Sequence, residues 1–304
     1  MGILTLLSVP ARAGENAFQG TSLPADPTWQ ATSGARAATG RSAACALRNP
    51  ATLVRSDQPD LSTSHLQWAN GVAREWAAIR GRLGTVKLVG DAALLHAPEL
   101  EGYDATGVAL GRFRAGEWTA GLSFAHDLAP GWAVGLGLRT TQLQDPEASL
   151  SAFSGSAGLL VEQGSWTAGV SLSDFGVLTG ANAESYGTDR RITLGIERAW
   201  GPGQLLAAAL ERGGDGRLAT RLGGSFAPHP SFELLAGCAW SAGDEGGELG
   251  AATGLRLALR RVAISYAFQP TASLGATHQI GLELSLQRGP SIWDGIREPI
   301  APAR

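Results

Sequence analysis

Residues 132–139 read Trp-Ala-Val-Gly-Leu-Gly-Leu-Arg, so a large apolar side chain stands at every second position with a small or polar residue between. A period of two is that of a β-strand, whose successive side chains point to opposite faces. The same alternation recurs at 118–125, 166–173, 191–197 and 279–286, with turn residues between the segments. Because no helical period interrupts this series, we expect antiparallel strands joined by hairpins.

The composition of the chain agrees with this pattern. Glycine makes up 42 of the 304 residues, about twice its usual share, and it is spread among the apolar residues of the strands. A net charge of −3 excludes a dedicated nucleic-acid-binding protein, which carries a basic excess. A hydrophobic content of 44 % excludes a disordered chain. We therefore expect a sheet-rich wall in which many positions need a small side chain.

The N-terminal residues 1–13 are predicted to be the remnant of a secretory signal peptide. An apolar stretch runs into Ala11-Arg12-Ala13, a small-x-small triplet typical of a cleavage site. No later apolar run reaches the ~20 residues of a transmembrane helix, so an exported chain of this kind crosses a membrane only as a closed barrel. The sequence leaves open whether Cys45 and Cys238 form a disulfide or stay as two thiols.

The parity of the strand count decides the architecture. A first count gives about 15 candidate strands, one of them over 104–114, whereas single-chain bacterial barrels have an even number. Placing 104–114 in a long outer loop leaves about 14 strands and gathers most tight turns on one rim. We predict an all-β fold, a 14-stranded antiparallel transmembrane β-barrel over 61–287. Residues 14–60 form a plug-like N-terminal segment in the lumen or periplasm, and 288–304 form a periplasmic tail.

The strand face opposite the large apolar residues is predicted to line the lumen. It carries Gly, Ser, Ala and Thr with few ions, whereas a solvated sheet face is richer in Lys, Glu and Gln. Tryptophans near the strand ends are typical of the aromatic girdles of a transmembrane barrel. The charged residues expected to face the lumen are Lys87, Asp91, Arg139, Arg191, Glu197, Arg221, Glu248, Arg256 and Glu283.

Several segments resemble one family in collinear order. Residues 34–53, GARAATGRSAACALRNPATL, resemble the N-terminal signature of the PorV/PorQ family of outer-membrane proteins, with Arg48 in place of that family's Trp. The resemblance implies a barrel similar to long-chain fatty-acid transporters, with the N-terminal segment plugging or lining the lumen. The residues that match the family's motifs are Gly34, Ala35, Arg36, Asn49, Pro50, His65, Trp68, Tyr266, Phe268, Gly275 and His278.

Three functional hypotheses follow. The resemblance implies a protein of the bacterial outer membrane that binds or guides exported proteins. A channel for hydrophobic small molecules is the first alternative, and a soluble periplasmic β-rich scaffold is the second. We find no GxSxG, Walker, HExxH or CxxC pattern, so we expect no enzymatic activity, cofactor or metal. The expected partners are outer-membrane lipid, secreted or periplasmic proteins and, for a channel, a hydrophobic ligand; nucleic acid is not expected.

Overall fold

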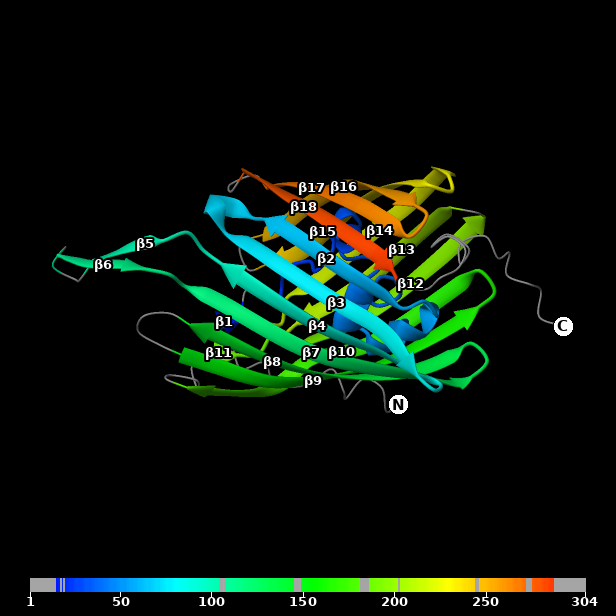
Figure 1. The fold of residues 1–304 in the computed structure, drawn as a ribbon, viewed down its shortest axis with the longest axis horizontal. Helices are drawn as coiled ribbons and strands as arrows, with labels where there is room; N and C mark the ends of the chain where they lie inside the picture. The colour runs from blue at the N-terminus through cyan, green and yellow to red at the C-terminus, as the bar shows by residue number, and fades with distance from the viewer. Residues whose placement is uncertain are drawn as a thin grey trace.

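The computed structural model describes residues 15–16, 18, 20–103, 106, 108–144, 149–180, 186–201, 203–243, 246–271 and 275–286. The predicted signal-peptide remnant 1–13 and the tail 288–304 lie outside them. Within the described residues, 14 strands form one closed barrel in which each strand pairs antiparallel with its neighbours (Figure 1). The predicted all-β, 14-stranded fold is therefore confirmed.

The barrel strands follow one another around the wall in chain order, and β18 pairs with β2 to close the ring. Their bounds are β2 (Asp60–Gln67), β3 (Ala73–Leu83), β4 (Val86–His96), β7 (Gly116–Ala129), β8 (Trp132–Gln144), β9 (Ser149–Gln163), β10 (Trp166–Gly180), β12 (Arg191–Gly201), β13 (Gln204–Gly213), β14 (Leu218–His229), β15 (Phe232–Gly243), β16 (Gly246–Leu259), β17 (Val262–Thr271) and β18 (Gly275–Ser285).

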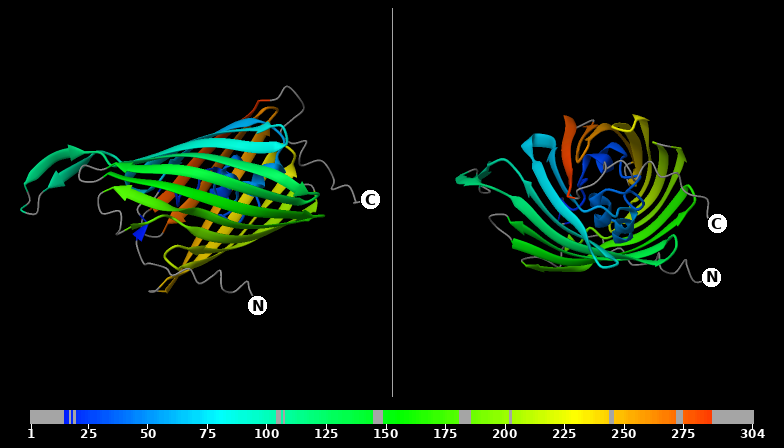
Figure 2. Two further views of the ribbon diagram at one scale, coloured as in Figure 1. Left: turned by 90° about the horizontal axis from the view of Figure 1, so that it is seen from below. Right: turned by 45° about the vertical axis from the view of Figure 1, so that its right-hand side comes forward.

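The two rims of the barrel differ. One rim, here called the short-turn rim, carries six connections in which only two residues separate the strands, and it also holds the start of β2 and the end of β18. The opposite, long-loop rim carries the hairpin of β5 (Leu100–Tyr103) and β6 (Ala109–Phe113). This hairpin projects away from the barrel (Figures 1 and 2). Strand β6, inside the segment 104–114, therefore pairs with β5 and does not enter the wall, and the number of barrel strands in the described residues is even.

The outer face of the wall is apolar. Leucines such as Leu136, Leu194 and Leu222 are exposed on it, and burying such area gains roughly 25 cal/mol per Å². A bilayer removes this area from water, whereas a soluble periplasmic scaffold would leave it exposed. Girdle tryptophans flank the apolar band, each 40–51 % exposed: Trp132, Trp166 and Trp200 near the short-turn rim, and Trp118 and Trp240 toward the long-loop rim.

The N-terminal segment lies inside the barrel and is called the plug (residues 18 and 20–58; Figure 2). It contains α1 (Pro27–Ala31) and the 3-10 turns η2 (Ala43–Leu47) and η3 (Pro50–Arg55). The Asp26 carboxylate caps α1 by accepting from the Trp29 backbone N–H at 2.7 Å, and the Asn49 side chain caps η3. Among the described residues, no helix is both long and apolar enough to cross a membrane.

The plug meets opposite sides of the wall. Helix α1 contacts β15 to β18, and η3 contacts β4 and β7 to β9. The wall has glycine at most of these places, and a Cβ there would meet plug atoms at or below van der Waals distance. At Gly254 it would lie 2.6 Å from Ala31 Cβ, and at Gly281 it would lie 2.8 Å from Pro27 Cδ. The wall glycines in contact with the plug are Gly135, Gly137, Gly158, Gly169, Gly195, Gly223, Gly237, Gly254 and Gly281.

We predict that Gly169→Ala destabilises the barrel by about 1–3 kcal/mol, because the new Cβ would overlap the Ala38 carbonyl oxygen, a backbone atom held by the plug. The matched control is Gly250→Ala, also on a barrel strand, where the Cβ would lie 3.7 Å from Gln269 Nε2. The measurement is the temperature at which the folded barrel loses its fast migration in a denaturing gel. Equal midpoints for the two variants would contradict backbone contact at Gly169.

Candidate functional site

Ion pairs fasten the plug to the wall. Glu197 on β12 accepts from Arg36 Nε at 3.0 Å and from Arg55 Nη1 at 2.8 Å. Both side chains of the Arg55–Glu197 pair are nearly buried, at 4 % and 3 % exposure. Although burial lowers it, the neighbouring Glu197 carboxylate raises the pKa of Arg36 above its ordinary value. This cluster, here called the Glu197 seam, therefore holds its charges in the absence of water.

A second buried cluster is built around Arg48. Its guanidinium stacks on the Trp29 ring, with the guanidinium carbon 5.2 Å from the ring centroid. It pairs with Asp174 at 3.2 Å and Asp189 at 3.6 Å. Burial of the guanidinium, followed by the charge of Arg191, lowers the pKa of Arg48. Arg48 is thus held by an aromatic ring of the plug and by two acids from outside the plug.

The charges continue from this cluster along the inner wall. Asp174 also accepts from Arg139 at 2.5 Å. Arg191 pairs with Asp189 and with Glu211, each at 2.7 Å. The centre of the lumen is thus filled by acids and arginines that form ion pairs with one another.

A β-bulge interrupts β10 beside Arg48. The pairing with β9 shifts register between Leu172 and Phe175, and Asp174 adopts a φ of 57°. Ser173 and Asp174 are both buried, at 0 % and 2 % exposure, so two consecutive side chains point into the lumen. The bulge is what brings the Asp174 carboxylate to Arg48 and Arg139.

The wall changes above the bulge. Strand β10 pairs with β12 only over Trp166–Ser173, but it pairs with β9 as far as Gly180. Within the part of the chain that the structure describes, no barrel strand pairs with residues 174–180 on the side of β12. We call this place, at the long-loop end of the pairing between β10 and β12, the notch. The hydrogen bonding of the barrel wall is interrupted there, and the short strand β11 (Tyr186–Gly187), which pairs with β1 (Glu15–Asn16) outside the barrel sheet, contacts β10.

An apolar cluster lies near the same end of the barrel. Phe18, at 2 % exposure, packs with Leu150 and Ala152 of β9, and Leu143 of β8 and Leu178 of β10 join them. Leu178 belongs to the stretch of β10 above the bulge, so this cluster adjoins the notch. The lumen is therefore ionic at its centre, and beneath the long-loop rim it holds this apolar cluster beside the buried Glu117, which faces Leu143 across the strands.

Most of the charges predicted to face the lumen lie inside it. Lys87 pairs with Asp57 of the plug, Arg256 with Glu283 at 2.5 Å, and Asp91 is buried on β4. Glu248 differs, because it is exposed near the long-loop end of β16. Several residues in contact with the lumen were not predicted from the sequence: Phe18, Asp57, Glu162, Asp174, Asp189 and Glu211. Of these, only Asp174 has a signal in the sequence, as the second of two consecutive polar residues inside a strand pattern.

The residues of the family resemblance fall into two groups. Gly34, Ala35, Arg36, Asn49 and Pro50 lie in the plug; Ala35 and Asn49 are fully buried there, and Gly34 has a φ of 78°. The second group lies on the outer face or the long-loop rim. His65 forms a hydrogen bond with Glu75 at 2.6 Å, and Tyr266 forms one with His278 at 2.7 Å. The Phe268 ring lies tilted against that of His278, Trp68 follows β2, and Gly275 begins β18.

The cysteines are both free. Cys45 is buried in the plug, and burial raises the pKa of its thiol to about 11, whereas Cys238 lies on β15 in the barrel wall. The alternative of a disulfide is therefore wrong. In the described residues, no group of three or more His, Cys, Asp or Glu side chains is placed to bind a metal ion.

No family model and no curated protein sequence matches the chain. Solved structures do match it. The CymD monoaromatic hydrocarbon channel has 13 % identity and a TM-score of 0.61, covering 86 % of this chain and 98 % of that one. The toluene transporter TodX of Pseudomonas putida has 12 % identity and a TM-score of 0.61, with 86 % and 96 % covered.

A FadL homologue from Pseudomonas aeruginosa has 8 % identity and a TM-score of 0.55, with 86 % and 98 % covered. At these identities the likeness is one of fold, and no family model or curated sequence supports the PorV/PorQ family. The shared fold and the apolar outer band place this protein in a bacterial outer membrane, with the short-turn rim toward the periplasm.

We predict that Glu197→Gln costs about 3–5 kcal/mol of unfolding free energy, because it leaves two buried arginines without their carboxylate. Glu162→Gln is the matched control: Glu162 also pairs with Arg55, at 2.8 Å, but it is 39 % exposed, and its loss should cost about 1 kcal/mol or less. Both values come from urea unfolding in detergent micelles, followed by tryptophan fluorescence. If the two variants lose equal stability, the Glu197 seam does not hold the plug.

Proposed function

We propose that this barrel is a transport protein, not an enzyme, and that it passes small hydrophobic molecules from the long-loop rim sideways into the membrane through the notch in β10. The observation that carries the proposal is the bulge at Ser173–Asp174, above which β10 runs on without β12. A solute that leaves there enters lipid directly and never crosses the plug.

The distribution of polarity supports this route. Passage straight along the barrel axis would require a molecule to separate the buried pairs of Arg48, Arg55 and Arg191, and uncovering buried charges costs several kcal/mol each. The cluster of Phe18 and its neighbours instead offers an apolar surface beside the notch. Transfer from this surface to lipid exchanges one apolar environment for another.

The fold comparisons support the class of solute. Two of the similar structures carry names of hydrocarbon channels or transporters, one for monoaromatic hydrocarbons and one for toluene. The alternative hypothesis, that the barrel guides exported proteins, is supported by the motif resemblance of residues 34–53. Secreted proteins are proposed as partners only if that hypothesis holds.

We predict that the size of residue 18 controls uptake. Phe18→Ala opens space in the apolar cluster, and uptake of N-phenylnaphthylamine, an apolar fluorescent probe, should rise several-fold in intact Gram-negative cells that produce the full chain; Phe18→Trp should lower it. The control is Phe153→Ala, a 57 % exposed phenylalanine on β9, which should leave uptake unchanged. Equal uptake by the wild type, Phe18→Ala and Phe18→Trp would contradict the proposal.

The bulge is tested separately. Deleting Asp174 removes the extra residue, so that β10 pairs with β9 in continuous register and loses its bend beside the start of β12; uptake should then fall to the level of cells without the protein. Asp174→Asn keeps the bulge, because Asn tolerates a positive φ, and removes only the charge; it should retain uptake in molecules that are folded by gel migration. A deletion variant that is folded and still active would rule out the lateral route.

A further inference from the structure

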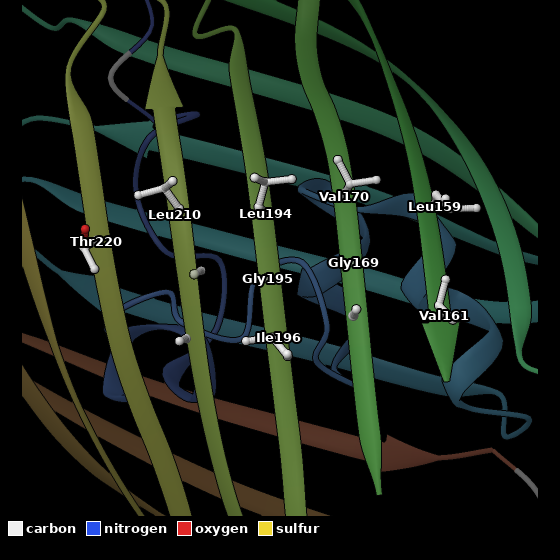
Figure 3. Close-up of a pocket in the computed structure, with 12 residues that line it drawn as sticks. Leu159, Val161, Gly169, Val170, Leu194, Gly195, Ile196, Leu210 and Thr220 are labelled. Atoms are coloured by element: carbon white, nitrogen blue, oxygen red, sulfur yellow. The ribbon is translucent and has the colours of Figure 1, made fainter. Parts of the chain in front are cut away.

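A groove on the outer wall has no part in the proposed route. It has a volume of about 560 Å³ and lies across β9, β10, β12, β13 and β14 (Figure 3). Val170, Leu194 and Leu210 border it toward the long-loop rim, and Leu159 and Val161 line it on β9. This groove faces the apolar interior of the membrane.

The register of the strands explains why the wall is indented there. Ile196 on β12 faces Ala168 across the β10 pairing and Ala208 across the β13 pairing. The next outward-facing row toward the long-loop rim consists of Val170, Leu194 and Leu210, whose side chains are larger than those of the two alanines. The two alanines therefore leave a depression on either side of Ile196. The shape of this depression suits a flexible hydrocarbon chain.

A cation stands at the short-turn end of this groove. Arg198 is the next outward residue after Ile196 on β12, and it pairs across the strands with Trp166. Its guanidinium carbon lies 4.8 Å from the ring centroid of Trp166 and 5.1 Å from that of Trp200. The two indoles, which belong to the tryptophan girdle, hold the guanidinium at the level where lipid headgroups lie.

Arg198 has no anionic partner of its own. Across the described ranges, no carboxylate lies within ion-pair distance of it, and its buried Nε has no hydrogen-bond partner. The arginines of the lumen discussed above are paired with acids, so this one differs from them. A guanidinium fork is the group that best matches a phosphate, through two parallel N–H···O bonds.

We propose that the groove and Arg198 together bind one glycerophospholipid of the periplasmic leaflet, with its phosphate on the Arg198 guanidinium and an acyl chain over Ala168 and Ala208. Charge favours a lipid over a second copy of this chain. A twofold contact through this face would bring Arg198 of one copy toward Arg198 of the other, and like charges repel in an apolar setting.

The test is native mass spectrometry of the full chain released from micelles that contain dioleoylphosphatidylglycerol. Wild-type protein should retain one lipid. Arg198→Gln should retain it about tenfold more weakly, since it loses a charge-assisted hydrogen bond. Arg261→Gln is the control: Arg261 is an exposed residue in the β16–β17 turn at the same rim, and its loss should leave the bound lipid in place.

Two further measurements distinguish the contribution of the lipid head group to binding from that of the groove. Ala208→Leu fills the depression while leaving Arg198 intact, and it should weaken retention of the lipid severalfold. Dioleoylglycerol, which has the same chains and no phosphate, should fail to displace the bound phospholipid. The proposal is overturned if Arg198→Gln and Ala208→Leu retain the lipid like the wild type, if dioleoylglycerol competes equally, or if the spectra show a dimer that Ala208→Leu dissociates.

Discussion

The structure depends on direct contact between the backbone of the plug and the backbone of the wall. Side chains on both surfaces would hold the two backbones apart, so the wall has glycine where the plug backbone touches it, as at Gly135, Gly169 and Gly237. With the surfaces in contact, water is excluded, and the ion pairs of the Glu197 seam work in a medium of low polarity. These wall glycines are thus a consequence of packing a second segment inside a barrel, and they do not indicate a flexible chain.

Close packing at the centre and discontinuity at the edge divide the barrel into two regions. The Glu197 seam and the Arg48 cluster occupy the centre, while Phe18, at the start of the plug, and its apolar neighbours lie toward the long-loop rim. The bulge of β10 joins the regions, because Asp174 belongs to the ionic cluster and Leu178 to the apolar one. A single extra residue in one strand therefore completes the central charge network at the level where the pairing of β10 with β12 ends.

The sequence predicted the fold well because the relevant signals are local. Alternation along 132–139 or 166–173 and the parity of the strand count need no knowledge of distant residues. The site was predicted only in part. Which acid meets Arg48 depends on the barrel bringing residues 48, 174 and 189 together, and no period in the chain encodes that. Asp174 was detectable as a break in alternation, whereas Phe18 lies in a segment with no pattern at all.

The plug precedes the first barrel strand in the chain, yet several residues that hold it come near the end. Gly281 of β18 rests on Pro27, and β18 itself closes the ring against β2. A closed ring leaves no side entry for a segment as wide as α1 with η2 and η3. The contacts of the plug with β18 therefore form only once the last strand of the barrel exists. Contacts between residues so far apart in sequence form slowly, so the plug and the ring share their slowest contacts at the same strand.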